Sequence, residues 1–384
     1  MGFQPSEPLR ILHCLPGLSG GVGRQRCLLA RDLPRATFAQ RVACYRGDAT
    51  MVSEALSQDV PVEMLPGPCR FYNARAAMAL ARLARHWRPT LVHGAVLEGN
   101  ALASWVGWSQ QVPVVLEEAT TTVENRSKIV RLFVRVLNRQ ARCVVAVSQR
   151  VASALRAQGI PGAKIRVIGN GVEDPGIPDL ASSARARQQL DIPPGSFVVG
   201  SVGRLHEQVK RLSDILDAVC LLPEGLRQRT YVVFVGDGPD KERLQSHANR
   251  VGLGSRLRLT GARDDHHVFY GLLDVFVLSS AVEAAPLALR EAMFAERACI
   301  ATRAGDAPDI IVNDVSGSLV DSHHPEQIAD ILGQWLPNQS QRAAIGKAAR
   351  RVALRRFLLA DYVKQISDLY TSICNGERPG PQNS

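Results

Sequence analysis

The sequence predicts an α/β protein built from two doubly wound parallel-sheet domains. Its 384 residues exceed what one hydrophobic core usually serves, because single cores stop growing at about 250–300 residues. Hydrophobic residues make up 46% and charged residues 21%, which excludes disordered and fibrous classes. Short β-branched runs alternate with segments of helical periodicity, the pattern of parallel sheets covered by helices.

Seven strand-like runs are expected in the first domain, residues 1–175, with helices between nearly all of them. The runs are 10–14, 41–44, 60–64, 90–93, 112–116, 143–147 and 164–168. A stretch rich in Pro, Gly and Ser, 174–183, then interrupts the alternation. We place the linker between the domains there.

Six further runs predict a second doubly wound sheet in the second domain, residues 176–357. They are 197–202, 231–235, 257–260, 275–278, 298–302 and 318–320. The segments 325–335, 340–357 and 360–373 read as helices with no strand after them. We expect the last helix, at about 358–384, to pack back on the first domain.

Composition also constrains the compartment and the partners. The start of the chain lacks a basic-then-apolar signal, and no run of about 18 apolar residues could span a bilayer, so we expect a cytoplasmic protein. The eight cysteines stand singly, which favours a reducing compartment and no zinc site. Residues 1–175 carry 22 Lys and Arg against 12 Asp and Glu, so the net charge of +10 lies there. This half could face an anionic ligand or surface, or simply be a soluble basic face.

Ligands of open parallel sheets bind beyond the carboxyl ends of the strands, so the loops after the strands are the candidate sites. Gly20 and Gly21 follow the first strand and can expose helix N–H groups to an anion, although a plain turn is the alternative. Gly203 and Arg204 follow the first strand of the second domain, and Lys210 comes soon after. Two cations there can hold a diphosphate and stabilise it as a leaving group; solvated surface is the alternative.

Two carboxylates form the next feature. Glu283 precedes a helix that Pro286 can start, and Glu291 lies about two turns into it. Carboxylates accept hydrogen bonds from pairs of hydroxyls, so the two could grip two sugar rings of one ligand. One acid at a helix N-terminus and one surface acid is the alternative. The acids and histidines at 237 and 264–267 read as turn or cap residues, and we expect no metal site.

Together these loops resemble the retaining glycosyltransferases of the GT-B fold, the family 4-like group that includes glycogen synthases and bacterial mannosyl- and glucosyltransferases. The resemblance covers nearly the whole chain. It rests first on Glu283 and Glu291, which are separated by seven residues, with a Pro after the first Glu. Gly203-Arg204-Leu205 and a lysine come before this pair in the chain, and residues 304–309 and Gly317 come after it. Asn170-Gly171-Val172 is a further matching segment. The fold it implies is two Rossmann-like domains facing across a cleft.

The resemblance implies a role for each matching residue. Arg204 and Lys210 would clamp the diphosphate of a UDP- or GDP-sugar, and Glu291 would hold the ribose. Glu283 would hold the donor sugar together with the backbone of Ala284, Ala285, Pro286 and Leu287. The loop with Gly261 and Arg263 would border the base, and Gly20 and Gly21 would approach the phosphates. Members of the family generally need no metal, and a donor phosphate oxygen is thought to accept the proton of the acceptor.

Three departures from the family pattern affect these roles. Ala284 stands where Gly is usual, which leaves the donor sugar open. Arg204 and Lys210 are six residues apart where five is commoner, so the loop must bulge, with Arg211 as the fallback cation. Where the family often has a His near the donor sugar, this chain has Glu117 and Glu118. We assign Glu118 to the catalytic set, and a cap on the following helix is the alternative.

Basic residues at helical spacing suggest how an acceptor is reached. They are Lys128, Arg131, Arg135, Arg139 and Arg142, which fall on one stripe of a helix. Such a helix could dock on an anionic membrane surface and bring a lipid-linked glycan to the enzyme, or it could be a core helix with a solvated side.

The sequence therefore predicts transfer of a sugar, with retention, from a nucleotide sugar to a glycan or lipid-linked glycan in bacterial surface polysaccharide or lipopolysaccharide synthesis. A peripheral position on the inner face of the membrane accompanies this function. The alternatives are a sugar-nucleotide epimerase of the same fold, and a non-catalytic module that binds nucleotide sugars or nucleic acid. Aromatic residues are only 5% of the chain and do not interleave with the basic stretches, which disfavours nucleic acid.

Overall fold

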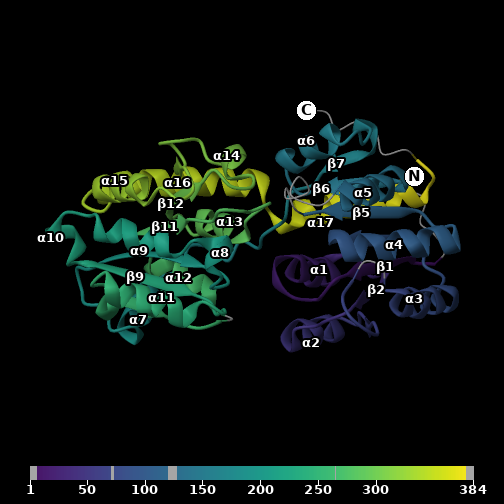
Figure 1. The fold of residues 1–384 in the computed structure, drawn as a ribbon, viewed down its shortest axis with the longest axis horizontal. Helices are drawn as coiled ribbons and strands as arrows, with labels where there is room; N and C mark the ends of the chain where they lie inside the picture. Colours follow the sequence, from purple (N-terminus) through teal and green to yellow (C-terminus); the bar gives the residue numbers. More distant parts are fainter. Residues whose placement is uncertain (1–6, 71–72, 120–127, 264, 378–384) are drawn as a thin grey trace. The chain divides into compact units, whose positions relative to one another are not determined.

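The computed structural model describes residues 7–70, 73–119, 128–263 and 265–377, and the chain divides into two compact units (Figure 1). Unit 1 contains the chain up to Gly171 and again from Leu359 onward, and unit 2 is Val172–Leu358. The division therefore falls four residues before the predicted one. Residues 174–183 are not all linker, because a helix capped by Asp179 begins at Leu180.

Unit 1 is a parallel sheet with strand order β3-β2-β1-β4-β5-β6-β7. Its strands are β1 (Leu9–Leu15), β2 (Phe38–Cys44), β3 (Val62–Met64), β4 (Leu91–Ala95), β5 (Val114–Glu118), β6 (Cys143–Ala146) and β7 (Ile165–Val167). The helices are α1 (Gly20–Asp32), α2 (Ala49–Ser57), α3 (Ala74–Trp87), α4 (Val96–Gln110), α5 (Lys128–Gln140), α6 (Gln149–Ala157) and α17 (Leu359–Cys374), with a short 3₁₀ turn at Gly162–Lys164.

The last helix, α17, closes the core of unit 1. The helix belongs to unit 1 (Figure 1, yellow). Its Ile366 and Tyr370 are buried in the same apolar cluster as Val115 of β5 and Cys143 of β6. The chain returns to unit 1 next to Gly171. A Cβ at Gly171 would lie 2.6 Å from Cβ of Tyr362 and 2.9 Å from Cα of Leu359, so only glycine allows this close approach of α17. The end of the predicted segment, 378–384, lies outside the described residues.

Unit 2 is a second parallel sheet, with strand order β10-β9-β8-β11-β12-β13. Its strands are β8 (Phe197–Val202), β9 (Thr230–Val235), β10 (Leu257–Leu259), β11 (Val275–Leu278), β12 (Ala298–Thr302) and β13 (Ser318–Val320). The helices are α7 (Leu180–Gln189), α8 (Glu207–Lys210), α9 (Ser213–Cys220), α10 (Glu224–Arg227), α11 (Lys241–Arg250), α12 (His266–Leu272), α13 (Leu287–Phe294), α14 (Ala307–Ile310), α15 (Pro325–Trp335) and α16 (Gln339–Arg356), with a 3₁₀ turn at Gly254–Arg256. Its strands separate two apolar clusters, so both faces of the sheet are covered.

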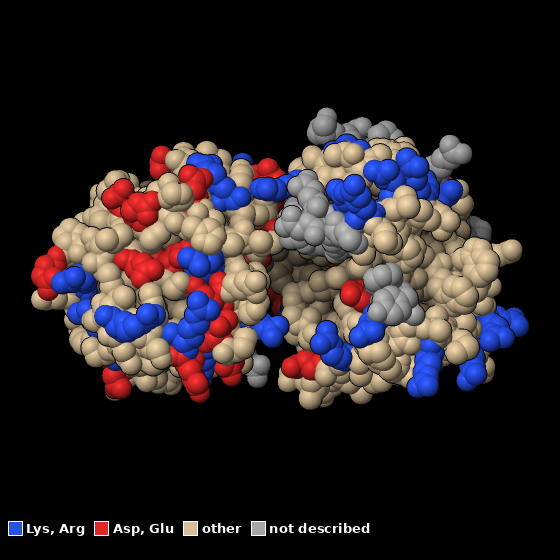
Figure 2. Space-filling view, in the orientation of Figure 1, with Lys and Arg blue, Asp and Glu red and all other residues tan. Residues whose placement is uncertain are grey.

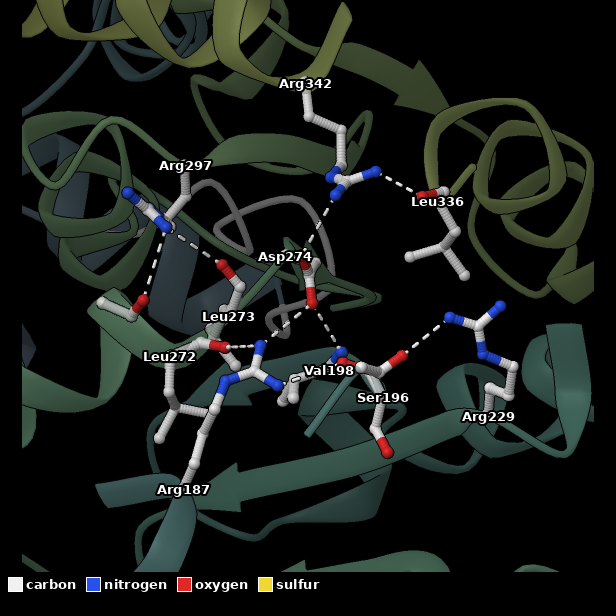
Figure 3. Close-up of polar contacts among 12 residues, drawn as sticks. Arg187, Ser196, Val198, Arg229, Leu272, Leu273, Asp274, Arg297, Leu336 and Arg342 are labelled. Atoms are coloured by element: carbon white, nitrogen blue, oxygen red, sulfur yellow. Dashed lines mark hydrogen bonds and ion pairs between the residues drawn. The ribbon is translucent and has the colours of Figure 1, made fainter. Parts of the chain in front are cut away.

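Asp274 ties three elements together at the amino end of β11 (Figure 3). Its carboxylate accepts hydrogen bonds from Arg187 at 3.2 Å, from the backbone N–H of Val198 at 2.8 Å and from Arg342 at 3.1 Å. Arg297 donates nearby to the carbonyl oxygen of Leu273 at 3.1 Å. One carboxylate thus joins α7, β8 and α16 where the strands begin.

The structure confirms two doubly wound parallel sheets, and each predicted strand run overlaps a strand of the described chain. The differences are at the ends of the strands: β2 begins three residues before the predicted run 41–44, and the predicted run 112–116 is displaced by two residues to Val114–Glu118. Pro113 explains part of this shift, since proline cannot donate to a sheet. No described helix combines the length and apolar character that crossing a bilayer would require.

Candidate functional site

The order of the strands in unit 2 points to one place for a ligand. β8 and β11 are neighbours in the sheet but are followed by connections that lead in opposite directions. Such a switch point leaves a crevice beyond the carboxyl ends of the two strands. The residues after β8 include Gly203, Arg204 and Lys210, and the residues after β11 include Glu283, so the sequence-predicted cations and the first acid flank this point.

Lys210 and Glu283 form an ion pair across the switch point. Nζ of Lys210 donates to Oε1 of Glu283 at 2.5 Å, with 24% and 13% of the two side chains exposed. The hydroxyl of Ser280 donates to the same Glu283 oxygen at 2.8 Å, and the hydroxyl of Ser279 donates to the carbonyl oxygen of Lys210 at 2.9 Å. Both partners are therefore oriented before any ligand arrives.

Arg204 and Lys210 line one small hollow of unit 2. Gly203 and Arg204 are exposed. The other residues of the hollow are Ser201, Val202, Leu205, Leu212, Leu278 and Ser280. The six-residue spacing is accommodated by the short helix α8, which ends at Lys210. Arg211, the fallback cation, instead pairs with Asp214 at 2.6 Å.

The loop after β12 packs against the loop that carries Glu283. Gly305 has φ +60°, and a Cβ there would lie 2.9 Å from both the carbonyl oxygen of Ala284 and Cβ of Glu283. Asp306, the next residue, forms an ion pair with Arg290, which is fully buried. Arg290 also donates to the carbonyl oxygen of Pro286 at 3.1 Å. These contacts, which the sequence did not reveal, join the two loops that would surround a sugar.

Glu291 is held from a neighbouring helix. The hydroxyl of Tyr270 on α12 donates to Oε2 of Glu291 at 2.6 Å, and Nε2 of His266 lies 3.6 Å from the same oxygen. One quarter of the Glu291 side chain is exposed. Neither Tyr270 nor His266 was predicted as part of the site, because nothing in the spacing of residues 266–291 shows that α12 and α13 are adjacent.

The remaining residues predicted in unit 2 lie at the same edge of the sheet. Ala285 and Pro286 are buried and Ala284 and Leu287 are half-buried around the start of α13. The carbonyl oxygen of Gly261 accepts a hydrogen bond from the N–H of Gly236 at 2.9 Å, which joins the loops after β9 and β10. Arg263 pairs with Asp265 at 2.7 Å. Asp264 lies outside the described residues.

In unit 1, Gly20 and Gly21 are exposed where α1 begins. Ser19 precedes them and makes no side-chain cap, so the first N–H groups of α1 are not bonded by that side chain. Gly20 has φ +61°. This position is compatible with anion binding.

The carboxylate of Glu118 is buried in unit 1. Only 2% of Glu118 and 3% of Glu117 is exposed. Asn100 of α4 and Asn138 of α5 donate to Oε1 of Glu118 at 3.1 and 3.4 Å. The assignment of Glu118 to the catalytic set stays a prediction. The alternative, a cap on the following helix, concerns residues 120–127, which lie outside the described residues.

Glu117 belongs to a buried polar network that the sequence did not reveal. It accepts a hydrogen bond from Arg26 at 2.8 Å, and Nη2 of Arg26 lies 3.2 Å from Nε2 of His93. Since arginine can only donate, Nε2 accepts and Nδ1 of His93 carries the proton, which points at the hydroxyl of Tyr370 2.5 Å away. Burial and the charge of Arg26 lower the pKa of His93 well below its usual value. This network fastens α17 to the sheet.

A separate hollow of about 910 Å³ lies in unit 1, where β5, β6 and β7 begin. Its lining includes Trp108, Gln111, Gln140, Arg142 and Lys164. It opens at the opposite end of the strands from Gly20 and Gly21, and doubly wound sheets bind their ligands at the carboxyl ends. We therefore do not assign it to the candidate site. Within the described ranges, no three His, Cys, Asp or Glu side chains gather as metal ligands would.

Two relatives and one solved structure illustrate what the chain is similar to. A D-inositol 3-phosphate glycosyltransferase of Corynebacterium urealyticum is 31% identical over 229 residues, which cover 58% of this chain and 52% of that protein. The lipopolysaccharide core biosynthesis glycosyltransferase LpsE of Rhizobium meliloti is 28% identical over 44% of this chain and 48% of that protein. The chain thus matches about half the length of these curated relatives.

The crystal structure of Anabaena Alr3699/HepE in complex with UDP and glucose has the same fold, with a TM-score of 0.83, 22% identity and coverage of 95% of this chain and 100% of that one. Two family models also match: residues 19–174 match Glycosyltransferase Family 4, and residues 182–352 match Glycosyl transferases group 1. Those two segments include the candidate residues of both units. The chain therefore has the GT-B fold, with a segment similar to Glycosyltransferase Family 4 followed by a segment similar to Glycosyl transferases group 1.

Proposed function

We propose that the chain transfers a sugar from a UDP- or GDP-linked donor to a glycan or lipid-linked glycan acceptor, with retention of the anomeric configuration. The observation that carries this proposal is the Lys210–Glu283 ion pair at the switch point of unit 2, beside the exposed Arg204. A structure of Anabaena Alr3699/HepE contains UDP-glucose, which supports a UDP-linked donor here.

In the proposed site, some residues contact the nucleotide and diphosphate of the donor and others contact its sugar. Arg204 and Lys210 hold the diphosphate and stabilise the negative charge that grows as the bond to the sugar breaks. Glu283 holds hydroxyls of the sugar, with the backbone of residues 284–287 around it. Glu291 accepts hydrogen bonds from the ribose. Within unit 2, Gly261 and Arg263 border the base.

The proposed reaction needs no nucleophile from the protein. The bond between the anomeric carbon and the diphosphate breaks, the acceptor oxygen forms the new bond on the same face, and a donor phosphate oxygen takes the acceptor proton. Neither a metal nor a cofactor takes part, because the two cations neutralise the diphosphate. Full activity after exhaustive treatment with a chelator would support this, and activity restored only by added divalent ions would contradict it.

The acceptor is proposed to lie at an anionic membrane. On α5, Lys128, Arg131, Arg135 and Arg139 are exposed, and blue side chains gather over this part of unit 1 in Figure 2. The same helix exposes 81% of Ile129, 60% of Leu132 and 43% of Val136. Exposed apolar side chains beside cations suit the interface of a bilayer.

Arg142 does not extend this stripe. It follows the end of α5, is half-buried and donates to the carbonyl oxygens of Gly376 and Glu377 at 2.8 and 2.9 Å. Val134 and Leu137 are buried, so α5 presents one face to the core and the stripe of four cations to solvent. Arg126, at the start of the predicted stretch, lies outside the described residues.

Flotation with vesicles tests the membrane proposal. Wild-type protein should float with vesicles that contain phosphatidylglycerol and not with neutral ones. Reversal of the four α5 charges to Glu should abolish flotation, whereas reversal of Arg82, Arg85 and Arg88, near α3, should not. Equal flotation of the two reversed variants would contradict the proposal.

The name of LpsE supports a place in lipopolysaccharide or surface polysaccharide synthesis.

A panel of nucleotide sugars tests the transferase proposal. UDP-glucose, UDP-N-acetylglucosamine, UDP-galactose and GDP-mannose are compared by thermal shift, since a bound donor raises the melting temperature by mass action. The product made from the stabilising donor is then analysed by NMR for its anomeric configuration. A product of inverted configuration contradicts retention. Release of an epimerised sugar without transfer favours the epimerase alternative, and no stabilisation by any nucleotide sugar contradicts the assignment.

A further inference from the structure

The hydroxyl of Tyr270 and the carboxylate of Glu291 form the closest contact between α12 and the candidate ribose site. The hydroxyl donates to Oε2 at 2.6 Å. Tyr270 is 1% exposed, whereas 25% of the Glu291 side chain is exposed. The contact therefore joins a rigid, buried donor to a carboxylate that a ligand can reach.

The hydroxyl of Tyr270 is the donor in this hydrogen bond. Burial, together with the nearby carboxylate, raises the pKa of Tyr270 well above its usual value. The phenol consequently keeps its proton at neutral pH and donates to the ionised carboxylate. A carboxylate offers about four acceptor positions, so the bond from Tyr270 leaves capacity for hydroxyl groups of a ligand.

Tyr270 is itself fixed by its neighbours. Its ring packs in one of the two apolar clusters of unit 2, with its centroid 5.9 Å from that of Phe276. The ring of His266, one turn earlier on α12, stands edge-on to it, with Nε2 3.6 Å from Oε2 of Glu291. Two side chains of α12 thus face one oxygen of Glu291 and restrict its side-chain rotation.

We propose that Tyr270 is a positioning residue whose hydroxyl orients Glu291 toward the ribose hydroxyls and so makes the site prefer ribonucleotides to 2′-deoxyribonucleotides. This inference rests on the proposed function, because it takes Glu291 as the residue that meets the ribose. A carboxylate that rotates freely must be ordered when ligand binds, and this ordering lowers affinity. Tyr270 removes that cost for ligands that carry both ribose hydroxyls.

Calorimetry with UDP, 2′-deoxy-UDP, GDP and 2′-deoxy-GDP tests the proposal on wild type, Tyr270→Phe, Tyr270→Met and Glu291→Ala. Wild type should bind the ribonucleotide of its preferred base more tightly than the deoxy form. Tyr270→Phe should lose roughly three- to tenfold in affinity for the ribonucleotide, as expected for the net contribution of one typical hydrogen bond, and little for the deoxy form. Glu291→Ala should bind the two forms equally.

Two controls separate positioning from folding. Tyr231→Phe removes a hydroxyl from β9 of the same unit and should leave the ratio of the two affinities as in wild type. Tyr270→Met fills the core with a flexible side chain, so the ratio can be measured even if one of the two Tyr270 variants folds poorly. Circular dichroism melting of each ligand-free variant reports folding.

Each outcome decides a different question. A smaller ratio in the Tyr270 variants, with the deoxy affinity retained, supports the proposal. An unchanged ratio, or an equal loss for both nucleotides, overturns it while Glu291→Ala still shows the ribose contact. If wild type binds none of the four nucleotides, the proposed function fails and this inference fails with it.

Discussion

Lys210 and Glu283 meet at 2.5 Å although 73 residues separate them in the chain. One follows β8 and the other follows β11, and only the adjacency of these strands brings the two side chains together. The pair lies at the switch point, where the connections after β8 and β11 lead in opposite directions, and the hydroxyl of Ser280 donates to the carboxylate of Glu283. A charge pair with 24% and 13% of its side chains exposed can be reached by a ligand that brings both phosphate and hydroxyl groups.

Replacement of Lys210 by Met should lower turnover by about a hundredfold or more, because a leaving diphosphate would lose a fixed cation worth roughly 3 kcal/mol in the transition state. Steady-state kinetics with the donor identified by thermal shift measures this. Lys347→Met, at an exposed lysine of α16 in the same unit, is the matched control and should behave as wild type. Equal turnover of the two variants would show that Lys210 does not act on the leaving group.

Gly305→Ala should lower kcat/KM for the donor. The new methyl group would lie 2.9 Å from Cβ of Glu283 and from the carbonyl oxygen of Ala284, at a backbone φ of +60°, so the loop that carries Glu283 must shift. Gly333→Ala is the control, since nothing lies within 4 Å of its Cβ position on α15. Wild-type kinetics of Gly305→Ala would contradict the proposed placement of Glu283 beside the donor sugar.

Arg26→Met should destabilise unit 1 by about 3–5 kcal/mol, because it leaves the carboxylate of Glu117 buried without its partner. Only 1% of the Arg26 side chain and 4% of that of Glu117 is exposed. Urea unfolding followed by fluorescence measures the change. Lys364→Met breaks a pair on α17 whose side chains are 73% and 64% exposed, and should change stability far less, because an exposed ion pair is screened by solvent. A comparable loss in the free energy of unfolding of both variants would show that the buried Arg26–Glu117 pair contributes no more than an exposed pair.

Unit 1 should lose stability as the pH falls below 6.5. Burial, together with Arg26, lowers the pKa of His13 from 6.5 to about 3 and that of His93 well below 6.5. Between pH 6.5 and about 3 the unfolded chain therefore binds a proton on His13 that the folded chain does not, and His93 acts in the same direction. The free energy of unfolding should fall by roughly 1.4 kcal/mol per pH unit from His13 over this range.

Urea titrations between pH 7 and pH 4.5 measure this dependence. His13→Gln should reduce the slope of the free energy of unfolding against pH by roughly the contribution of one histidine. The exposed His86 of α3 is the control, and His86→Gln should leave the slope unchanged. A slope that is the same for wild type and His13→Gln would show that His13 is not held neutral in the fold.

The positions of the strands could be predicted because each is a short apolar run between turn residues. β12, Ala298–Thr302, is buried along its whole length and reads as such in the sequence. The loops after β8 and β11 could also be predicted as sites, since chain direction alone places them at the carboxyl edge. The start of α7 at Leu180 was missed, because its polar sequence has no apolar stripe and only Asp179 marks its beginning.

The burial of Glu118 has a physical cause that the sequence does not show. An acid at the end of a buried strand can project into solvent or turn into the core, and the choice depends on which groups satisfy it there. Asn100 and Asn138, from two different helices, provide those hydrogen bonds. Burial of the carboxylate therefore depends on packing between α4, α5 and β5.

Local patterns alone determined the α/β class, the two sheets, and the cations and acids offered by the loops, because hydrophobic periodicity and chain direction are properties of short segments. Tertiary structure alone decided which of these side chains meet: Lys210 with Glu283, Tyr270 with Glu291, and Arg26 with Glu117. The reason is that each contact depends on the order of strands in a sheet and on helices packed against one another, and neither is encoded in the spacing of the residues concerned.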